Sequence, residues 1–132
     1  MTNPVEAVLA FFEAINAHDP ERLAELMTDD HIFTDSLGAL VRGREKMRGG
    51  WRSYFAFCPD YRVSHEAIFR EGETVAAFGS AGGTISVNGQ MAAENKWQTP
   101  AAWRMAVRDG RICEFQVYAD NKPVYEILAK SR

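Results

Sequence analysis

Three residues that could take part in chemistry alternate along one short stretch of the chain: His31, Phe33 and Asp35. Side chains two residues apart point to the same face of a β-strand, so one face carries an aromatic ring and two titratable groups. A carboxylate in an apolar, aromatic pocket is costly to keep as an ion, which suits a general base. Asp35 is therefore the first catalytic candidate. The alternative is that Asp35 begins a turn at Ser36 and faces water.

Two further residues could assist Asp35. In an extended strand the Cα atom of His31 lies about 6.5–7 Å from that of Asp35, and its ring could orient a substrate or move a proton. Otherwise His31 is a histidine at the rim of the pocket. Asp120 is either a second acidic catalytic group or the cap of the last helix. The Asn-Lys-Pro sequence that follows it favours the cap.

Large aromatic side chains recur on the elements that would surround this site. The expected substrate contacts are Phe33, Trp51, Tyr54, Trp103 and Phe115, and Trp97 shares their character. Such residues also build hydrophobic cores, but a pocket in this kind of fold is the unfilled part of the core. We expect Tyr54 and Trp51 to donate hydrogen bonds into it.

Metal and cofactor sites are not indicated. His18 and His65, like His31, lack the spacing to one another that metal ligands have, so no metal is expected. His18 is expected at the surface and His65 on a strand. The glycines at positions 79, 82 and 83 precede a strand and not a helix, which argues against a phosphate-binding loop. We expect no cofactor.

The elements that would position these residues follow from periodicity. Apolar residues at helical spacing predict a helix over residues 5–15, begun by Asn3 and Pro4, and a shorter one after Asp19 that buries Leu23, Leu26 and Met27. A third helix is expected at 45–57 and a short one at 124–130. Alternating residues predict strands at 31–35, 61–69, 75–85, 96–107 and 111–119, with turns at 71–73, 88–89 and 109–110.

Helices followed by a meander of long strands predict an α+β fold, and the glycines inside the second long strand suggest a curved antiparallel sheet. The 132 residues fit one domain, 1–132. Hydrophobic residues make up 46% of the chain, which is ordinary for a globular protein.

The charge pattern gives no sign of a nucleic-acid partner. The net charge is −3, and the basic residues at 42, 44, 46 and 48 are interpreted as a solvated helix start. No apolar run approaches the roughly 20 residues that a membrane helix needs. The first 15 residues lack the basic start of a secretion signal, and the two cysteines form no close pair. A cytoplasmic protein is expected.

Four segments together resemble the SnoaL-like group of the nuclear transport factor 2-like superfamily, which is related to polyketide cyclases, ketosteroid isomerases and limonene epoxide hydrolases. They are residues 12–19 (FEAINAHD), 29–35 (DDHIFTD), 43–45 (GRE), and 109–112 (DGRI) with 118–120 (YAD). Their order and spacing cover nearly the whole chain. The resemblance implies a cone-shaped fold with a deep pocket, and a homodimer formed through the sheet.

The resemblance implies a role for Asp35 but not the complete machinery of the best-known relatives. Asp35 falls where ketosteroid isomerases keep their proton-moving carboxylate. Their two enolate-stabilising donors correspond to Phe11 and about Trp103, and the loss of one such donor typically reduces the rate by ~10²–10³. The charged residues of the epoxide hydrolases correspond to Gly79, Ala81 and Val117, which cannot replace them.

The sequence thus leaves two hypotheses of different kinds. In the first, the protein is a cofactor-free isomerase, cyclase or hydrolase that acts on a hydrophobic carbonyl- or polyketide-like substrate, with Asp35 as general base and His31 as helper. SnoaL-type cyclases use an acid from the region of Asp120, which gives that residue some weight. In the second, the domain binds a ligand or forms a dimer without catalysis.

Overall fold

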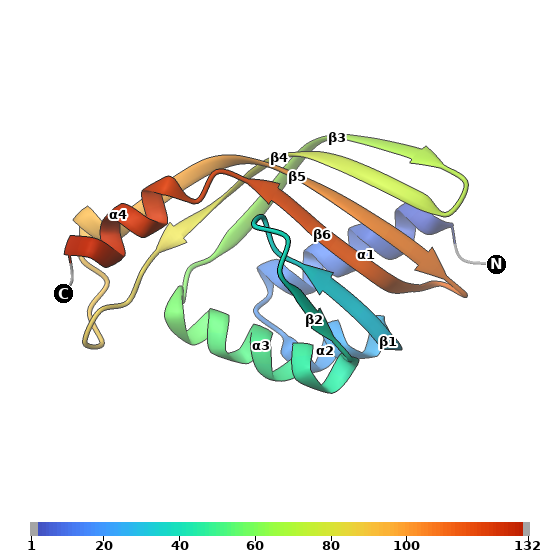
Figure 1. Ribbon diagram of the computed structural model, residues 1–132, viewed down its shortest axis with the longest axis horizontal. Helices are drawn as coiled ribbons and strands as arrows, with labels where there is room; N and C mark the ends of the chain where they lie inside the picture. Colours follow the sequence, from blue (N-terminus) through green and yellow to red (C-terminus); the bar gives the residue numbers. More distant parts are fainter. Residues whose placement is uncertain (1–2, 131–132) are drawn as a thin grey trace.

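The computed structural model describes residues 3–130. Helices and strands follow the order α1 (Pro4–Asn16), α2 (Pro20–Glu25), β1 (Met27–Thr34), β2 (Leu40–Arg42), α3 (Arg44–Phe57), β3 (Arg62–Glu71), β4 (Thr74–Thr84), a 3₁₀ turn η1 (Ala93–Asn95), β5 (Lys96–Arg108), β6 (Arg111–Ala119) and α4 (Lys122–Lys130). The long strands form one layer, with α1, α2 and α3 on its concave side (Figure 1). The fold is the expected α+β arrangement.

The helix starts follow the capping residues seen in the sequence. The Asn3 side chain accepts a hydrogen bond from the backbone N–H of Val5 at 2.8 Å, and Pro4 occupies the first turn. Asp19 accepts from the N–H of Arg22 at 3.0 Å and begins α2. That second helix ends sooner than expected, because Met27 already belongs to β1 and is buried there as a strand residue.

The sheet has the strand order β2-β1-β6-β5-β4-β3. All neighbouring strands are antiparallel except β1 and β6, which are parallel, so the sheet is mixed where an antiparallel one was expected. A parallel pair needs a long connection between its strands, and here α3 and the β3–β5 meander provide it. The three-residue edge strand β2 was not predicted, because so short a segment carries no clear alternation.

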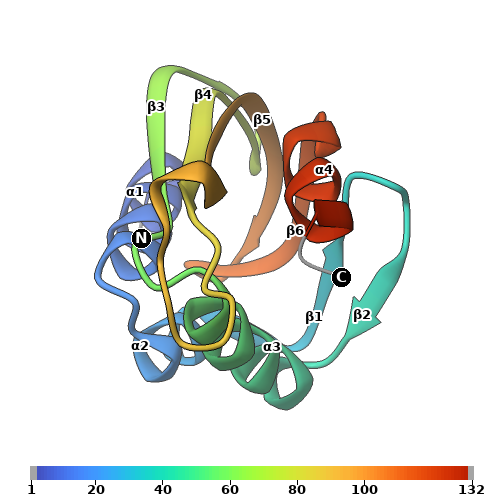
Figure 2. The same ribbon diagram turned by 90° about the vertical axis from the view of Figure 1, so that its left-hand side faces the viewer.

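The expected curvature has a local cause in β3 and β4. The register between these strands shifts between His65 and Ala67, which marks a β-bulge. At this point a Cβ atom on Gly79 would lie 1.9 Å from the carbonyl oxygen of Ser64, so only glycine fits. Figure 2 shows the resulting arch of β3–β6 over α3.

Two of the predicted turns have the backbone that their residue types favour. Asn88 and Gly89 have φ of 53° and 76°, and Asp109 and Gly110 have 53° and 79°. Positive φ at both central residues is the signature of a type I′ turn. The second turn joins β5 to β6 and thereby sets the register of the strands that carry Trp103 and Phe115.

Candidate functional site

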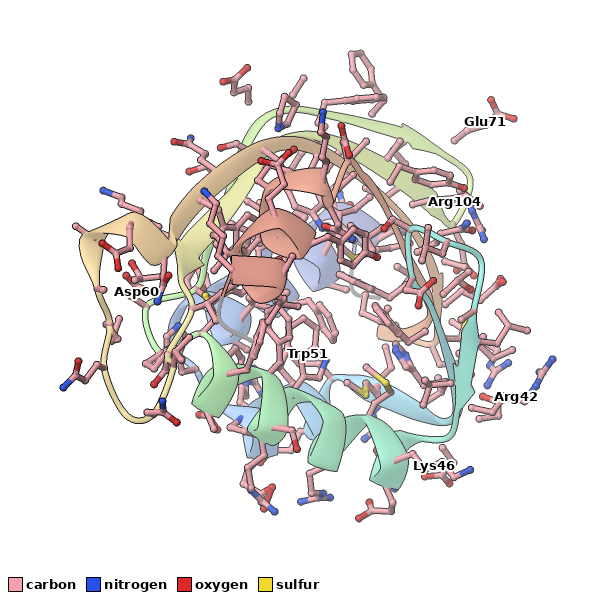
Figure 3. The ribbon with its side chains drawn as sticks, turned by 60° about the vertical axis from the view of Figure 1, so that its left-hand side comes forward. Arg42, Lys46, Trp51, Asp60, Glu71 and Arg104 are labelled. Atoms are coloured by element: carbon pink, nitrogen blue, oxygen red, sulfur yellow. The ribbon has the colours of Figure 1, made fainter. Side chains whose placement is uncertain are left out.

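A cavity of about 340 Å³ lies between α3 and the concave face of the sheet. Its aromatic lining comprises Phe33, Trp51, Tyr54, Tyr61, Trp97, Trp103 and Phe115. Figure 3 shows Trp51 between α3 and the arch of strands, whereas Arg42 and Glu71 lie at the outside of the molecule. The five expected substrate contacts therefore share the wall of one cavity.

Asp35 also lines the cavity, directly after β1. Its Oδ1 atom accepts hydrogen bonds from the backbone N–H groups of Leu37 and Ala39, both at 2.9 Å. Asp35 is half-buried. It stabilises the turn that follows β1, as one expectation had it, and it also lines the pocket, as the other had it. Within the described chain its Oδ2 atom has no hydrogen-bond partner.

His31 lies in the packed core and does not line the cavity, so it is neither a helper that faces the substrate nor a histidine at the rim of the pocket. The ring is fully buried and is stacked at 6.3 Å from the ring of Phe11. Its Nδ1 atom is 2.7 Å from the carbonyl oxygen of Ile112, which requires an N–H there. Burial lowers the pKa of His31 below its usual 6.5. In this structure His31 fastens β1 to β6.

Asp120 is exposed and is not part of the cavity wall, although Ala119 and Asn121 on either side of it are. Its carboxylate accepts from the backbone N–H of Lys122 at 2.9 Å, at the start of α4. This contact agrees with the capping interpretation that the sequence favoured over a catalytic one.

The polar part of the wall surrounds Asp35. Asn121 donates from Nδ2 to the hydroxyl of Ser36 at 2.7 Å, and this bond joins residues 85 positions apart in sequence. Thr99, which is 4% exposed, donates to the carbonyl oxygen of Asp120 at 2.9 Å. The first bond joins the loop after β1 to the start of α4, and the second joins the start of α4 to β5, so the segment that carries Asp35 is tied to the sheet.

The opposite part of the wall contains two tyrosines. The rings of Tyr54 and Tyr61 meet edge to face at 4.8 Å. Burial raises the pKa of both phenols, so both stay protonated at neutral pH. His18, expected at the surface, is half-buried here: its Nε2 lies 2.7 Å from the backbone carbonyl of Tyr61, and its ring stacks on Phe55.

Two of the four basic residues around the start of α3 are paired with acids. Arg44 forms an ion pair with Asp29, and Arg48 binds Glu21 through its Nη1 at 2.7 Å. Lys46 lines the rim of the cavity and makes no ion pair within the described residues.

Across residues 3–130, no three His, Cys, Asp or Glu side chains are grouped so that they could hold a metal ion. None of the helices in this range has the length and apolar character needed to cross a membrane.

The chain belongs to the SnoaL-like domain family, whose profile matches residues 8–115. This confirms the resemblance seen in the sequence. No curated protein matches the chain significantly.

Solved structures extend the comparison. A protein with a ketosteroid isomerase-like fold from Catenulispora acidiphila, in complex with trimethylamine, is 27% identical with a TM-score of 0.79, over 98% of this chain and 94% of its own. IdmH from Streptomyces antibioticus, a proposed polyketide cyclase, is 28% identical with a TM-score of 0.79, over 97% of this chain and 99% of its own. A proposed SnoaL-like polyketide cyclase from a Jannaschia species, 21% identical with a TM-score of 0.81 over 96% and 91% of the two chains, shares the fold.

Several wall residues were not singled out from the sequence. Tyr61 stands just before β3, and its aromatic ring in an alternating pattern could have indicated it. Lys46, Thr99 and Asn121 carry no such signal. They reach the cavity only because the start of β5, the start of α3 and the start of α4 converge there.

Proposed function

We propose that this protein binds a hydrophobic, carbonyl-containing small molecule in the cavity and removes a proton from the carbon next to a carbonyl, with Asp35 as general base. The observation that carries this proposal is the Asp35 side chain itself. One of its carboxylate oxygens is fixed by two backbone N–H groups, and the other is uncommitted in the wall of an aromatic cavity.

The chemistry follows from this arrangement. The two N–H bonds engage Oδ1 and fix the carboxylate in place, which leaves Oδ2 available to accept a proton. The free Oδ2 of Asp35 would take the proton, and the electron pair of the broken C–H bond would move into the substrate's own conjugated carbonyl system. The Phe11 and Trp103 positions offer no strong donor, so the substrate must delocalise most of the negative charge itself. We place polyketide-like and aromatic ketones in this class.

The direct test is deuterium exchange into 2-tetralone, a bicyclic ketone with acidic C–H groups, followed by NMR in D₂O. Asp35→Asn keeps an oxygen that can accept the two backbone hydrogen bonds, so the turn and the fold should remain. We expect the rate of exchange to fall by about 10²–10⁴. Asp120→Asn is the matched control, since it changes an exposed carboxylate outside the cavity. If Asp35→Asn and Asp120→Asn both exchange at the wild-type rate, Asp35 is not the base.

A second candidate is binding without catalysis, and the relative that contains trimethylamine favours it. Aromatic ring faces and a carboxylate both attract an ammonium group, and the wall of this cavity contains Trp51 as well as Asp35. Titration with tetramethylammonium tests this function. Saturable binding that Asp35→Asn weakens, without any exchange activity toward ketones, would support it over the first.

We also propose that two copies pair through the outer face of the sheet. Phe69, Phe78 and Tyr118 expose 62%, 48% and 49% of their surfaces there. The strands place Phe78 and Tyr118 on either side of Ala102, and Phe69 contacts Phe78. Sedimentation analysis should report a dimer that Phe78→Glu dissociates. A monomeric wild-type protein would contradict this.

The two cysteine thiols bear on the cellular compartment of the protein. Cys58 and Cys113 are not bridged to each other, and burial raises the pKa of the Cys58 thiol to about 11. Unpaired thiols are typical of reducing compartments, so we propose a cytoplasmic location.

A further inference from the structure

Two phenol groups in the cavity wall have no hydrogen-bond acceptor among the described residues. Tyr54 is half-buried and Tyr61 is 9% exposed, and both line the cavity. Neither side-chain hydroxyl makes a hydrogen bond within residues 3–130. Neither hydroxyl oxygen is among the fully enclosed polar atoms that lack a partner, so a molecule in the ligand-sized cavity can reach both and accept their hydrogen bonds.

These phenols are held in place by the surrounding structure. The backbone of Tyr61 is fixed on both sides, because its N–H donates to the carbonyl of Cys58 at 3.0 Å and its own carbonyl accepts from His18 at 2.7 Å. The Tyr61 ring packs against Trp97 at 6.1 Å and meets the Tyr54 ring edge to face. Two rings fixed in this way can present hydroxyl groups without much loss of side-chain entropy on binding.

The tyrosines and Asp35 belong to opposite sides of the cavity. Asp35 follows β1, whereas Tyr61 precedes β3, and β6, β5 and β4 lie between these strands in the sheet. Helix α3 runs from the β2 side toward β3, so Tyr54, near its end, also lies on the Tyr61 side (Figure 2). A ligand that fills the cavity therefore meets a carboxylate at one end and two hydroxyl donors at the other.

We propose that Tyr54 and Tyr61 together bind a carbonyl oxygen of the substrate, remote from the carbon that Asp35 deprotonates. A carbonyl oxygen has two lone pairs and can accept from two donors. Phenols kept protonated by burial suit this purpose because they donate hydrogen bonds without carrying charge. A second negatively charged side chain in the cavity would be repelled by the Asp35 carboxylate. The inference rests on the proposed function and narrows the substrate to an aromatic or fused-ring molecule with carbonyl groups at two separate positions. Both tyrosines are positioning residues.

The test compares two probes of nearly the same shape, 2-acetylnaphthalene, which has a carbonyl, and 2-ethylnaphthalene, which has none. Equilibrium dialysis measures the affinity of each. The wild-type protein should prefer the ketone, and Tyr54→Phe and Tyr61→Phe should each weaken ketone binding about 2- to 10-fold without changing hydrocarbon binding. Tyr118→Phe, which changes a phenol on the outer face of the sheet, is the matched control.

The outcomes separate this inference from the function on which it rests. If the wild-type protein binds both probes equally, or if both Phe variants keep the full preference for the ketone, the tyrosine proposal is wrong while Asp35 can still be the base. If Asp35→Asn shows unchanged exchange but the preference depends on the tyrosines, the base is wrong and the tyrosine site stands. Binding of neither probe overturns the tyrosine proposal together with the aromatic-ketone pocket.

Discussion

The concave face of the sheet is covered differently at the two ends of the long strands. At one end, α1 covers the sheet, and the facing residues are large and enclosed, such as Val75, Met105 and Ile112. At the other end, the facing residues are small, with Ala81 paired to Thr99 and Ala101 paired to Ala119. The cavity lies at this second end.

The comparison shows that the hollow depends on residue size as much as on backbone shape. The same strands pass through both ends, and the sheet face is continuous. Where side chains shrink to alanine and threonine, the rings of Tyr54, Tyr61 and Trp97 contact one another across the gap and keep α3 at a distance. The packed end should therefore lose stability when volume is removed or added, whereas the hollow end should lose ligand binding when volume is added.

The largest effect is expected from removing a ring at the packed end. Phe11 is fully buried beside His31 and Phe115, so Phe11→Ala should lower the free energy of unfolding by about 3–5 kcal/mol. Phe33→Ala removes the same atoms from a half-buried ring that already borders the cavity, and it should cost clearly less. Urea titration of both variants measures the difference. Equal losses would mean that the two ends are not packed differently.

Added volume should lower the unfolding free energy at the packed end and ligand binding at the hollow end. Ala77 and Ala81 both face inward from β4, at 1% and 4% exposure. Ala77→Leu overfills the packed end and should cost about 1–3 kcal/mol of unfolding free energy. Ala81→Leu enters the cavity, so stability should change by less than about 1 kcal/mol while binding of 2-acetylnaphthalene is lost. If Ala81→Leu binds the probe normally, the cavity is not the binding site.

A third expectation concerns His31, which is part of the packed end. Its folded-state pKa lies below the unfolded value of 6.5, so the unfolded chain binds more protons between these two values. The stability due to neutral His31 is complete above pH 6.5 and is lost as pH falls toward the folded pKa, by at most about 1.4 kcal/mol per pH unit.

This pH dependence can be isolated with His31→Gln, whose amide can still donate to the Ile112 carbonyl. The difference in urea-unfolding free energy between wild type and variant should be constant above pH 7 and shift in favour of the variant below pH 6. His18 and His65 remain in both proteins, so their contributions cancel. A difference that does not vary with pH would show that the pKa of His31 is the same in the folded and unfolded states.

Much of the fold could be predicted from the sequence because local signals agreed with the tertiary structure. Asn3 and Asp19 begin helices, and the Asp109–Gly110 turn fixes the last hairpin. The parallel pairing of β1 with β6 could not be predicted, since it depends on a contact between segments some 80 residues apart in sequence, such as the one from His31 to Ile112.

The site was predictable in its lining but not in its polar geometry. Trp103 and Phe115, which the sequence analysis proposed as substrate contacts, both line the cavity. Periodicity places His31 and Asp35 on the same strand face, but it does not show that α1 covers the first and leaves the second open. Nor does any local signal bring Asn121 to Ser36.

The smallest predicted effect lies at that last contact, which joins the Asp35 loop to α4 at the hollow end. The Ser36–Asn121 bond is partly exposed, so a double-mutant cycle with Ser36→Ala and Asn121→Ala should give a coupling of about 0.5–1 kcal/mol in unfolding free energy. Since Ser36 directly follows Asp35, Ser36→Ala should also release the turn and slow exchange of 2-tetralone modestly, without a comparable change in 2-acetylnaphthalene affinity. A coupling near zero, with unchanged exchange, would mean that Asp35 is positioned by its own turn alone, through the Leu37 and Ala39 N–H groups.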